Sequence, residues 1–282
     1  MTANRPPAPI VIKIGGTAHE ASGAAAPLWK AVARLGALPG GAIVVHGGKD
    51  AIDRQLALAN KPVERVEGLR VTPSDQIDHV EAALAGVVNG AIVRALCAQG
   101  AKAAGLTLCD GGMARAERLR PGGADIGHVG VVTSGDPHLV RTLVGAGYLP
   151  VIASIATGPA REALNVNADD AAAAVAAMVG ARALVLLTGV AGVLDAAGAV
   201  IPRIAMAEAD AMIADGRIVD GMIPKIRAAL TAARAAGCPV TIGGWSTEPE
   251  RAALSEGRAF GTTIDASPVK PATAHAEQGM LS

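Results

Sequence analysis

The segment Ile10-Val11-Ile12-Lys13-Ile14-Gly15-Gly16 decides the fold class of this chain. Its apolar, mostly β-branched run predicts a short buried strand, and the glycine pair ends that strand. The same order returns at 42–59, where an apolar strand runs into His46-Gly47-Gly48-Lys49 and then into a helical stretch. Glycines let a backbone approach a ligand closely, and the amides of a following helix attract anions. Two such turns therefore favour an anion-binding site, although each taken alone is equally typical of a tight turn.

The alternation of strand, glycine turn and helix continues along the chain. Further apolar strands are expected at 103–108, 131–132, 148–153, 183–187, 239–242 and 261–264. This order predicts an α/β fold, an open αβα sandwich with a mostly parallel central sheet and with ligands at the carboxyl ends of its strands. We expect two halves, residues 1–180 and 181–265, and a disordered tail over 266–282, where no periodicity is visible.

The composition narrows the class of protein. Hydrophobic residues make up 51% and charged residues 18% of the 282 residues, which is enough for a packed core. Lysine plus arginine and aspartate plus glutamate both number 25, so the chain lacks the overall basic excess of a typical nucleic-acid binder. Its three cysteines are scattered, which disfavours a zinc site or a disulfide framework. Without an evident signal peptide or membrane-length apolar run, a cytoplasmic protein is expected, with neither nucleic acid nor membrane as partner.

Three distant side chains suggest the chemistry. Lys13 ends the first strand, Lys225 lies in Asp220-Gly-Met-Ile-Pro-Lys225, and Asp169 ends Asn165-Val-Asn-Ala-Asp169. Phosphoryl transfer needs positioning and positive charge around the moving group more than covalent help from the protein. We therefore interpret the two lysines as transition-state cations, held apart and aimed by Asp169.

Two other polar residues have open roles at this point. Arg70, in the loop Gly68-Leu-Arg-Val-Thr72, could clamp a carboxylate in bidentate fashion, although an isolated arginine is more often a surface residue. His128 could be a base, but phosphorylation of a carboxylate needs none, so a structural or substrate-lining role is favoured. The long apolar helix expected at 74–99 is equally consistent with a core helix and with a dimer contact.

The combined order and spacing of these motifs resembles the amino acid kinase family, and within it the acetylglutamate kinases of arginine biosynthesis. The similarity runs from Ile10 to Ile264, nearly the whole chain. The stretches that carry it are Lys13-Ile-Gly-Gly16, His46-Gly-Gly48, Gly68-Leu-Arg-Val-Thr72, Asp125-Ile-Gly-His-Val-Gly130, Asn165-Val-Asn-Ala-Asp169, Leu187-Thr188 with Gly192-Val193-Leu194, Gly221-Met-Ile-Pro-Lys225 and Gly261-Thr-Thr-Ile264.

The resemblance implies a carbamate-kinase-like fold and a reaction. ATP with Mg²⁺ would phosphorylate the side-chain carboxylate of N-acetyl-L-glutamate, with no dedicated protein cage for the metal. Residues 1–180 would bind the acyl amino acid and form the dimer, and 181–265 would bind ATP. Lys13, Lys225 and Asp169 would be catalytic. Substrate-binding residues would be Gly47, Gly48, Lys49, Arg70 and Asn165, and nucleotide-binding residues Gly15, Gly16, Thr188, Gly189, Val190, Gly192, Val193, Leu194, Arg217, Ile218 and Val219.

Three departures from the family pattern leave the acyl group open. Lys49 stands where a third glycine is usual, Cys109 where a lysine is common, and Gly189 where an acid is common. N-succinylglutamate is therefore an alternative substrate. Another is 2-aminoadipate linked to an acidic carrier protein, for which an arginine rim at 115, 118 and 120 could serve. A non-catalytic sensor of amino acid or nucleotide is the alternative from another class.

The resemblance also suggests an oligomeric state. Arginine-inhibited relatives carry an extra N-terminal helix that joins dimers into a ring. Before Ile10 this sequence has nine residues, three of them proline, which do not form a helix of that length. A homodimer insensitive to arginine is expected.

Overall fold

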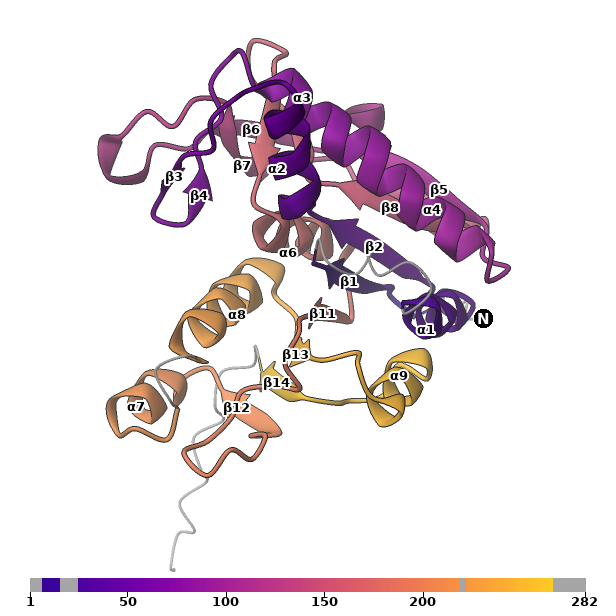
Figure 1. Cartoon of the computed structure of the whole chain (residues 1–282). Coiled ribbons are helices and arrows are strands. Elements are labelled where there is room, and N and C mark those ends of the chain that lie inside the picture. The colour runs from indigo at the N-terminus through magenta and orange to yellow at the C-terminus, as the bar shows by residue number, and fades with distance from the viewer. Residues whose placement is uncertain (1–6, 16–24, 219–221, 266–282) are drawn as a thin grey trace, which may run out of the picture.

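The fold is built on one twisted eight-stranded sheet. A computed structural model describes residues 7–15, 25–218 and 222–265, so the expected tail at 266–282 lies outside the described residues. The strand order is β12-β14-β13-β11-β1-β2-β8-β5, and every neighbouring pair is parallel except β13 and β14. The α/β sandwich with a mostly parallel sheet is therefore confirmed (Figure 1). The strands are β1 (Ile10–Ile14), β2 (Ala42–His46), β5 (Ala103–Thr107), β8 (Leu149–Ala153), β11 (Ala183–Leu187), β12 (Arg203–Ala205), β13 (Val240–Gly243) and β14 (Thr262–Asp265).

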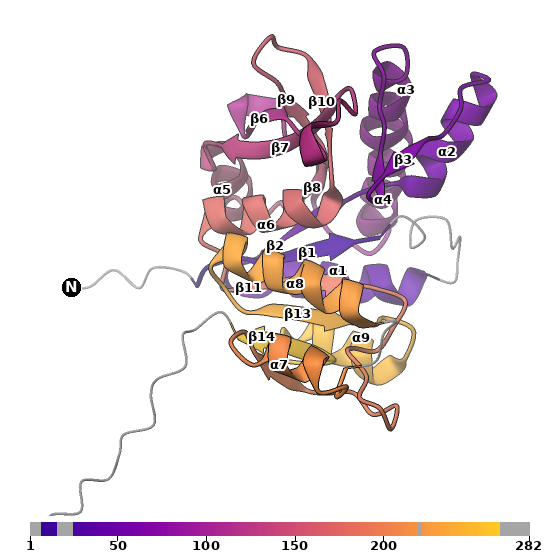
Figure 2. The ribbon, with the colours of Figure 1, turned by 90° about the vertical axis from the view of Figure 1, so that its left-hand side faces the viewer.

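Both faces of the sheet are covered because successive strand residues point to opposite sides. In β1, Ile10, Ile12 and Ile14 belong to one apolar core, whereas Val11 belongs to the other. Helices α1 (Ala26–Gly36), α4 (Asn89–Cys97) and α9 (Glu248–Ser255) contribute to the first core. Helices α5 (His138–Gly145), α6 (Ala168–Val179), α7 (Ala209–Ala214) and α8 (Ile223–Ala236) contribute to the second (Figure 2).

A second, smaller layer lies beyond one end of the sheet. Four short strands form a closed sheet in the order β10-β7-β6-β9, and two more form a hairpin. Strands β6 and β7 pair in antiparallel fashion. The other short strands were not expected, because two to four residues carry no readable periodicity. These elements are β3 (Arg65–Val66), β4 (Leu69–Arg70), β6 (Arg115–Arg118), β7 (Val129–Ser134), β9 (Ile155–Thr157) and β10 (Ala163–Val166).

One expected helix is subdivided. The long helix expected at 74–99 runs from Ile77 to Cys97, and its middle, Ala82–Val88, is wound as a π-helix between α3 (Ile77–Glu81) and α4. By length and composition alone this helix could cross a membrane, but its buried residues Leu84, Val88, Ile92 and Leu96 pack in the cores of this fold. The remaining helices are α2 (Lys49–Leu58) and the short turns Asp110–Gly112 and Pro121–Gly123.

The π-helical segment packs directly on the second glycine turn. A Cβ atom on Gly48 would lie 2.8 Å from Val88 Cγ2 and 2.9 Å from Leu84 Cδ2. Both of these side chains are at most 1% exposed, so neither can move aside freely. Gly48 has a φ of −172°, which any residue can adopt. Close approach of the helix, rather than backbone conformation, therefore requires glycine here.

Gly48→Ala should lower the free energy of unfolding by about 1–3 kcal/mol, because the added methyl group overpacks the contact with the π-helix. Urea denaturation monitored by circular dichroism measures this. Gly15→Ala is the matched control, since a Cβ there meets nothing within 4 Å. Equal stability of the two variants would show that the helix does not press on Gly48.

Candidate active site

An ion pair joins the central strand to the helix that follows the smaller sheet. Lys13 shares a face of β1 with Val11, which packs in the α6 core, so its side chain points toward α6. Its Nζ lies 3.0 Å from Asp169 Oδ1, and the two side chains are 16% and 33% exposed. Asn167 caps α6 by accepting hydrogen bonds from the amides of Asp169 and Asp170. The positive end of this helix also favours the Asp169 carboxylate.

A second carboxyl group lies beside this pair. Desolvation, and then the charge of Asp169, raises the pKa of Asp170 above its ordinary value. Asp169 has the Lys13 ammonium as its partner.

Lys225 lies at the same edge of the sheet but is not joined to Asp169. Helix α6 leads into β11 and α8 leads into β13, and both strands run parallel to β1. Each helix must therefore begin at the carboxyl edge of the sheet, close to Lys13, which is one residue before the end of β1. Lys225 lies in the first turn of α8, and α8 packs against α6. The ion pair of Asp169 is with Lys13, and the described residues contain none between Asp169 and Lys225.

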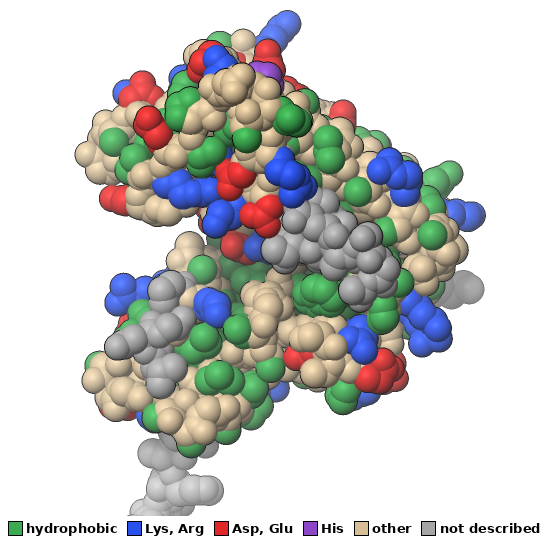
Figure 3. Space-filling view, in the orientation of Figure 1, with side chains coloured by type: hydrophobic (Ala, Val, Ile, Leu, Met, Phe, Trp, Pro, Cys, Tyr) green, Lys and Arg blue, Asp and Glu red, His purple; other side chains and the backbone are tan. Residues whose placement is uncertain are grey.

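A cavity of about 170 Å³ opens beside the start of α6. A Cβ on Gly47 would lie 3.1 Å from that of Ala168, so the glycine turn after β2 directly contacts the first residue of α6. Charged side chains of both signs gather along the upper margin of the hollow on this face (Figure 3). The cavity is lined by Gly47, Gly48, Lys49, Ile52, Arg65, Gly68, Leu69, Arg70, Leu84, Val129, Ser154, Asn165, Val166, Asn167 and Ala168.

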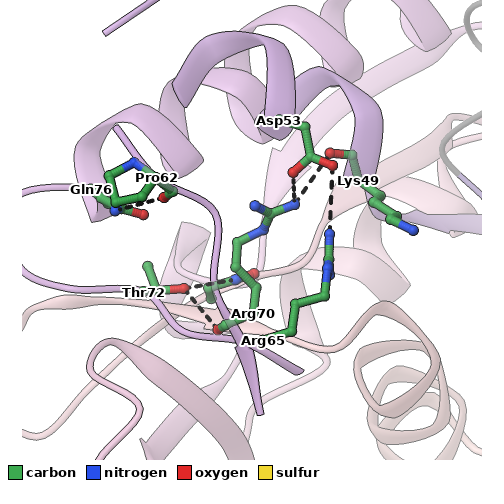
Figure 4. Close-up of polar contacts among 8 residues, drawn as sticks. Lys49, Asp53, Pro62, Arg65, Arg70, Thr72 and Gln76 are labelled. Carbon is green, nitrogen blue, oxygen red and sulfur yellow. Dashed lines mark hydrogen bonds and ion pairs between the residues drawn. The ribbon is translucent and has the colours of Figure 1, made fainter. Parts of the chain in front are cut away.

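Arg70 is held in this cavity with half of its guanidinium unpaired. The residue is 7% exposed, and its Nη2 donates to the Asp53 carboxylate and to the Lys49 carbonyl. Its Nη1 is buried and has no hydrogen-bond partner (Figure 4). Arg65 Nη2 lies 3.5 Å from the other Asp53 oxygen. Because a buried donor without a partner is costly, Nη1 is ready to bind an acceptor that enters the cavity.

The expected substrate residues therefore lie together at one cavity, although Lys49 contacts Arg70 through its backbone. Gly47, Gly48, Arg70 and Asn165 all line the cavity. Lys49 reaches Arg70 through its backbone carbonyl, whereas its side chain points away from Asp53 (Figure 4).

His128 serves the structure around the cavity. It is 8% exposed and is not among the cavity-lining residues. Its Nε2 lies 3.0 Å from Ser74 Oγ and 3.3 Å from Arg118 Nη2, and its Nδ1 lies 3.2 Å from the Ala163 carbonyl oxygen. These contacts favour the structural role over that of a base.

The residues expected at a nucleotide also lie at the carboxyl edge. After β11, Thr188 donates its amide to the Gly243 carbonyl, and its hydroxyl closes a turn onto Val190. The Val193 amide donates to Thr262 Oγ1 over 2.8 Å, which fixes the end of this loop against β14. Gly189 is exposed, Leu194 is half-buried, and Gly192 lies against Thr262. The loop is thus anchored at both ends.

The other residues expected to bind a nucleotide differ in how accessible their side chains are. Asp215 binds Arg217, and this hydrogen bond raises the pKa of the guanidinium. Ile218 is 2% exposed and packs in the core, so its side chain is not free to line a ligand. Gly15 is described, whereas Gly16 and Val219 lie outside the described residues.

Sequence reasoning missed Asp53, Arg65 and Thr72 as site residues. Asp53 lies one turn after Lys49, the first residue of α2, which follows the glycine turn. Arg65 stands opposite Arg70 in the β3–β4 hairpin. The spacing of Lys49 and Asp53 can be read from the sequence, whereas the pairing of Arg65 with Arg70 is visible only in the folded structure.

Comparisons with known proteins agree with this architecture. The sequence is 41% identical over 259 residues to the acetylglutamate kinase of Serratia proteamaculans (strain 568), covering 91% of this chain and 98% of that one. The crystal structure of smu.665 from Streptococcus mutans UA159 superposes with a TM-score of 0.70 at 31% identity, covering 92% of this chain and 98% of that one. A Giardia carbamate kinase structure, with a TM-score of 0.61 at 16% identity over 92% of this chain and 99% of that one, shares the fold. The sequence model of the amino acid kinase family matches residues 8–244, and the chain belongs to that family.

Proposed function

We propose that this protein transfers the γ-phosphoryl group of ATP to the side-chain carboxylate of N-acetyl-L-glutamate, giving an acyl phosphate and ADP in arginine biosynthesis. The observation that carries the proposal is the buried Arg70, which lines a small cavity at the sheet edge where Lys13 meets Asp169 and whose Nη1 has no hydrogen-bond partner. The 41% identity to an acetylglutamate kinase over nearly the full length of both chains supports this substrate.

The substrate is proposed to bind by its two ends. Arg70 takes the α-carboxylate through Nη1, because a charge-assisted hydrogen bond would satisfy the orphaned donor. Asn165 contacts the acyl amide, and the backbone of Gly47, Gly48 and Lys49 closes around the acyl group. The side-chain carboxylate then extends toward Lys13.

Lys13 and Lys225 are the cations proposed for the transition state. As the phosphoryl group moves, charge spreads over its equatorial oxygens, and fixed ammonium groups stabilise that charge. Asp169 forms an ion pair with Lys13 and orients its ammonium group. Lys225 approaches from α8 at the same edge, where it is not paired with Asp169 before substrates bind.

ATP is proposed to lie along residues 181–265, in the second half of the chain. Gly15 and Gly16, the loop Thr188–Leu194, and Arg217, Ile218 and Val219 are its proposed contacts, with Ile218 acting through its backbone. No group of three or more His, Cys, Asp or Glu side chains in the described part of the chain could hold a metal ion. Mg²⁺ is therefore proposed to arrive on the nucleotide phosphates and to neutralise their charge there.

The proposal includes a cytoplasmic homodimer. Carrier-linked 2-aminoadipate is the alternative substrate to assay. Arg118, one of the three arginines suggested as a binding rim for the carrier, already contacts Glu162 and His128. A sensor without turnover is the alternative from another class.

The proposed reaction predicts hydroxamate formation when Mg-ATP, N-acetyl-L-glutamate and hydroxylamine are incubated with the protein, because hydroxylamine traps acyl phosphates. N-succinylglutamate and carrier-linked 2-aminoadipate should give a kcat/KM lower by about 10-fold or more, the range that one poorly fitted group costs. ADP release in a coupled assay is the second readout. Binding of N-acetylglutamate without product would support the sensor, and faster turnover of another substrate would replace the proposed one.

The assignment of Arg70 predicts a rise in KM rather than a fall in kcat. Arg70→Ala should raise the KM for N-acetylglutamate by about 10- to 100-fold, the loss of one charged hydrogen bond. Asp53→Asn should raise it less, because the arginine remains but loses its ionic partner. The KM for ATP should stay unchanged in both.

Glu256→Gln is the matched control for the aspartate variant. It removes a carboxylate charge from an exposed pair with Arg258, outside the cavity. An Arg70→Ala enzyme with the wild-type KM for N-acetylglutamate would disprove the carboxylate clamp.

A further inference from the structure

Thr72 is a buried residue that joins the arginine loop to the smaller sheet. It is 0% exposed, its amide donates to the Ile126 carbonyl, and its carbonyl accepts from the amide of His128 over 2.6 Å. A Cβ on Gly127, whose φ is +75°, would lie 2.2 Å from the Thr72 carbonyl oxygen. The backbone of Thr72 is thus held in one position.

The Thr72 hydroxyl has a single proton, and its neighbours determine where that proton goes. Oγ1 lies 3.2 Å from the carbonyl oxygen of Arg70, which can only accept. The residue has no access to solvent, so water cannot substitute for either partner. The proton is therefore donated to Arg70, and toward any other neighbour Oγ1 can only accept.

That other neighbour is the side-chain amide of Asn165, 3.3 Å away. An amide facing an acceptor must present its NH₂ group, so the hydroxyl fixes which way round this amide sits. The backbone of Asn165 is also fixed, because its own amide donates to the His128 carbonyl over 2.8 Å. Rotation of the side-chain amide of Asn165 is the freedom that remains, and the hydrogen bond to Thr72 prevents this rotation.

The oxygen of the same amide is left available to a ligand. Asn165 Oδ1 makes no hydrogen bond with any described residue and is not among the buried unpaired atoms, so it reaches open space. Asn165 and Arg70 line the same cavity, and the Nη1 of Arg70 has no hydrogen-bond partner. An acceptor on Asn165 and an unpaired donor on Arg70 therefore belong to residues of one cavity.

We infer that Thr72 is a positioning residue that keeps Asn165 Oδ1 facing the cavity, so that the site selects acyl amino acids whose acyl group is joined through an N–H. This inference rests on the proposed function and adds the residue that sets its preference for an amide. An amide N–H donates to Oδ1. An ester oxygen at the same place brings lone pairs against Oδ1 and leaves that acceptor unpaired, which a site built for an N–H disfavours.

The test compares N-acetyl-L-glutamate with (S)-2-acetoxyglutarate, which has an ester oxygen in place of the N–H. The wild-type protein should prefer the amide by about 10- to 100-fold in kcat/KM, the cost of one unsatisfied polar group. Thr72→Val removes the hydroxyl at nearly constant shape, which lets the Asn165 amide turn over, so the preference should fall to within about threefold. Thr72→Ser keeps the hydroxyl and should keep the preference. The KM for ATP should be unchanged in both variants.

Two results would overturn the inference. Equal use of the amide and the ester by the wild-type protein would do so without any variant, so a Thr72→Val chain that fails to fold leaves the test intact. Retention of the full preference in a folded Thr72→Val protein would show that another group orients Asn165.

Calorimetric binding separates failure of this inference from failure of the proposed function. Preferential binding of N-acetylglutamate over the ester, with no hydroxamate formed, would contradict the kinase proposal and retain the role of Thr72. Turnover of both ligands at equal efficiency would retain the kinase and contradict that role.

Discussion

The ion pair between Lys13 and Asp169 is the contact on which the rest of the site depends. Lys13 belongs to a strand paired on both sides, by β2 and β11, so its backbone is fixed within the sheet. Asp169 lies in a helical first turn that Asn167 caps, where the helix dipole favours its charge. The structure thus places a charged amine and its counter-ion at the carboxyl edge before any substrate arrives, which is the preorganisation that electrostatic catalysis requires.

The cavity contains a second cation that is paired with an aspartate. Arg70, like Lys13, has an aspartate partner on a helix that follows a strand end, here Asp53 on α2. In both cases an aspartate binds the cation, and the Nη1 of Arg70 is left without a hydrogen-bond partner. Two prepositioned cations suit a substrate with two carboxylates, one to be gripped and one to be phosphorylated. Thr72 completes this arrangement by linking the Arg70 carbonyl to the Asn165 amide.

The central sheet was predictable because strands buried on both faces must be continuously apolar, as in β1, β2, β8 and β11. Lys13 was recognisable because a charged residue within such a run stands out, and Asp169 because it ends the polar stretch Asn165-Val-Asn-Ala-Asp169. The short strands β3, β4, β9 and β10 have too few residues for a pattern. Asp53 and Thr72 acquire their roles from contacts between segments remote in sequence, and the contact of the π-helix with Gly48 likewise joins segments far apart in the chain.

The central claim is that Lys225, unpaired with Asp169 here, joins Lys13 at the moving phosphoryl group. Steady-state kinetics of Lys225→Ala test it most directly, with Lys30→Ala on the exposed side of α1 as the control. The account predicts a kcat lower by about 100-fold or more and a much smaller change in both KM values, because the contact strengthens in the transition state. A Lys225→Ala protein with wild-type kcat would contradict the account.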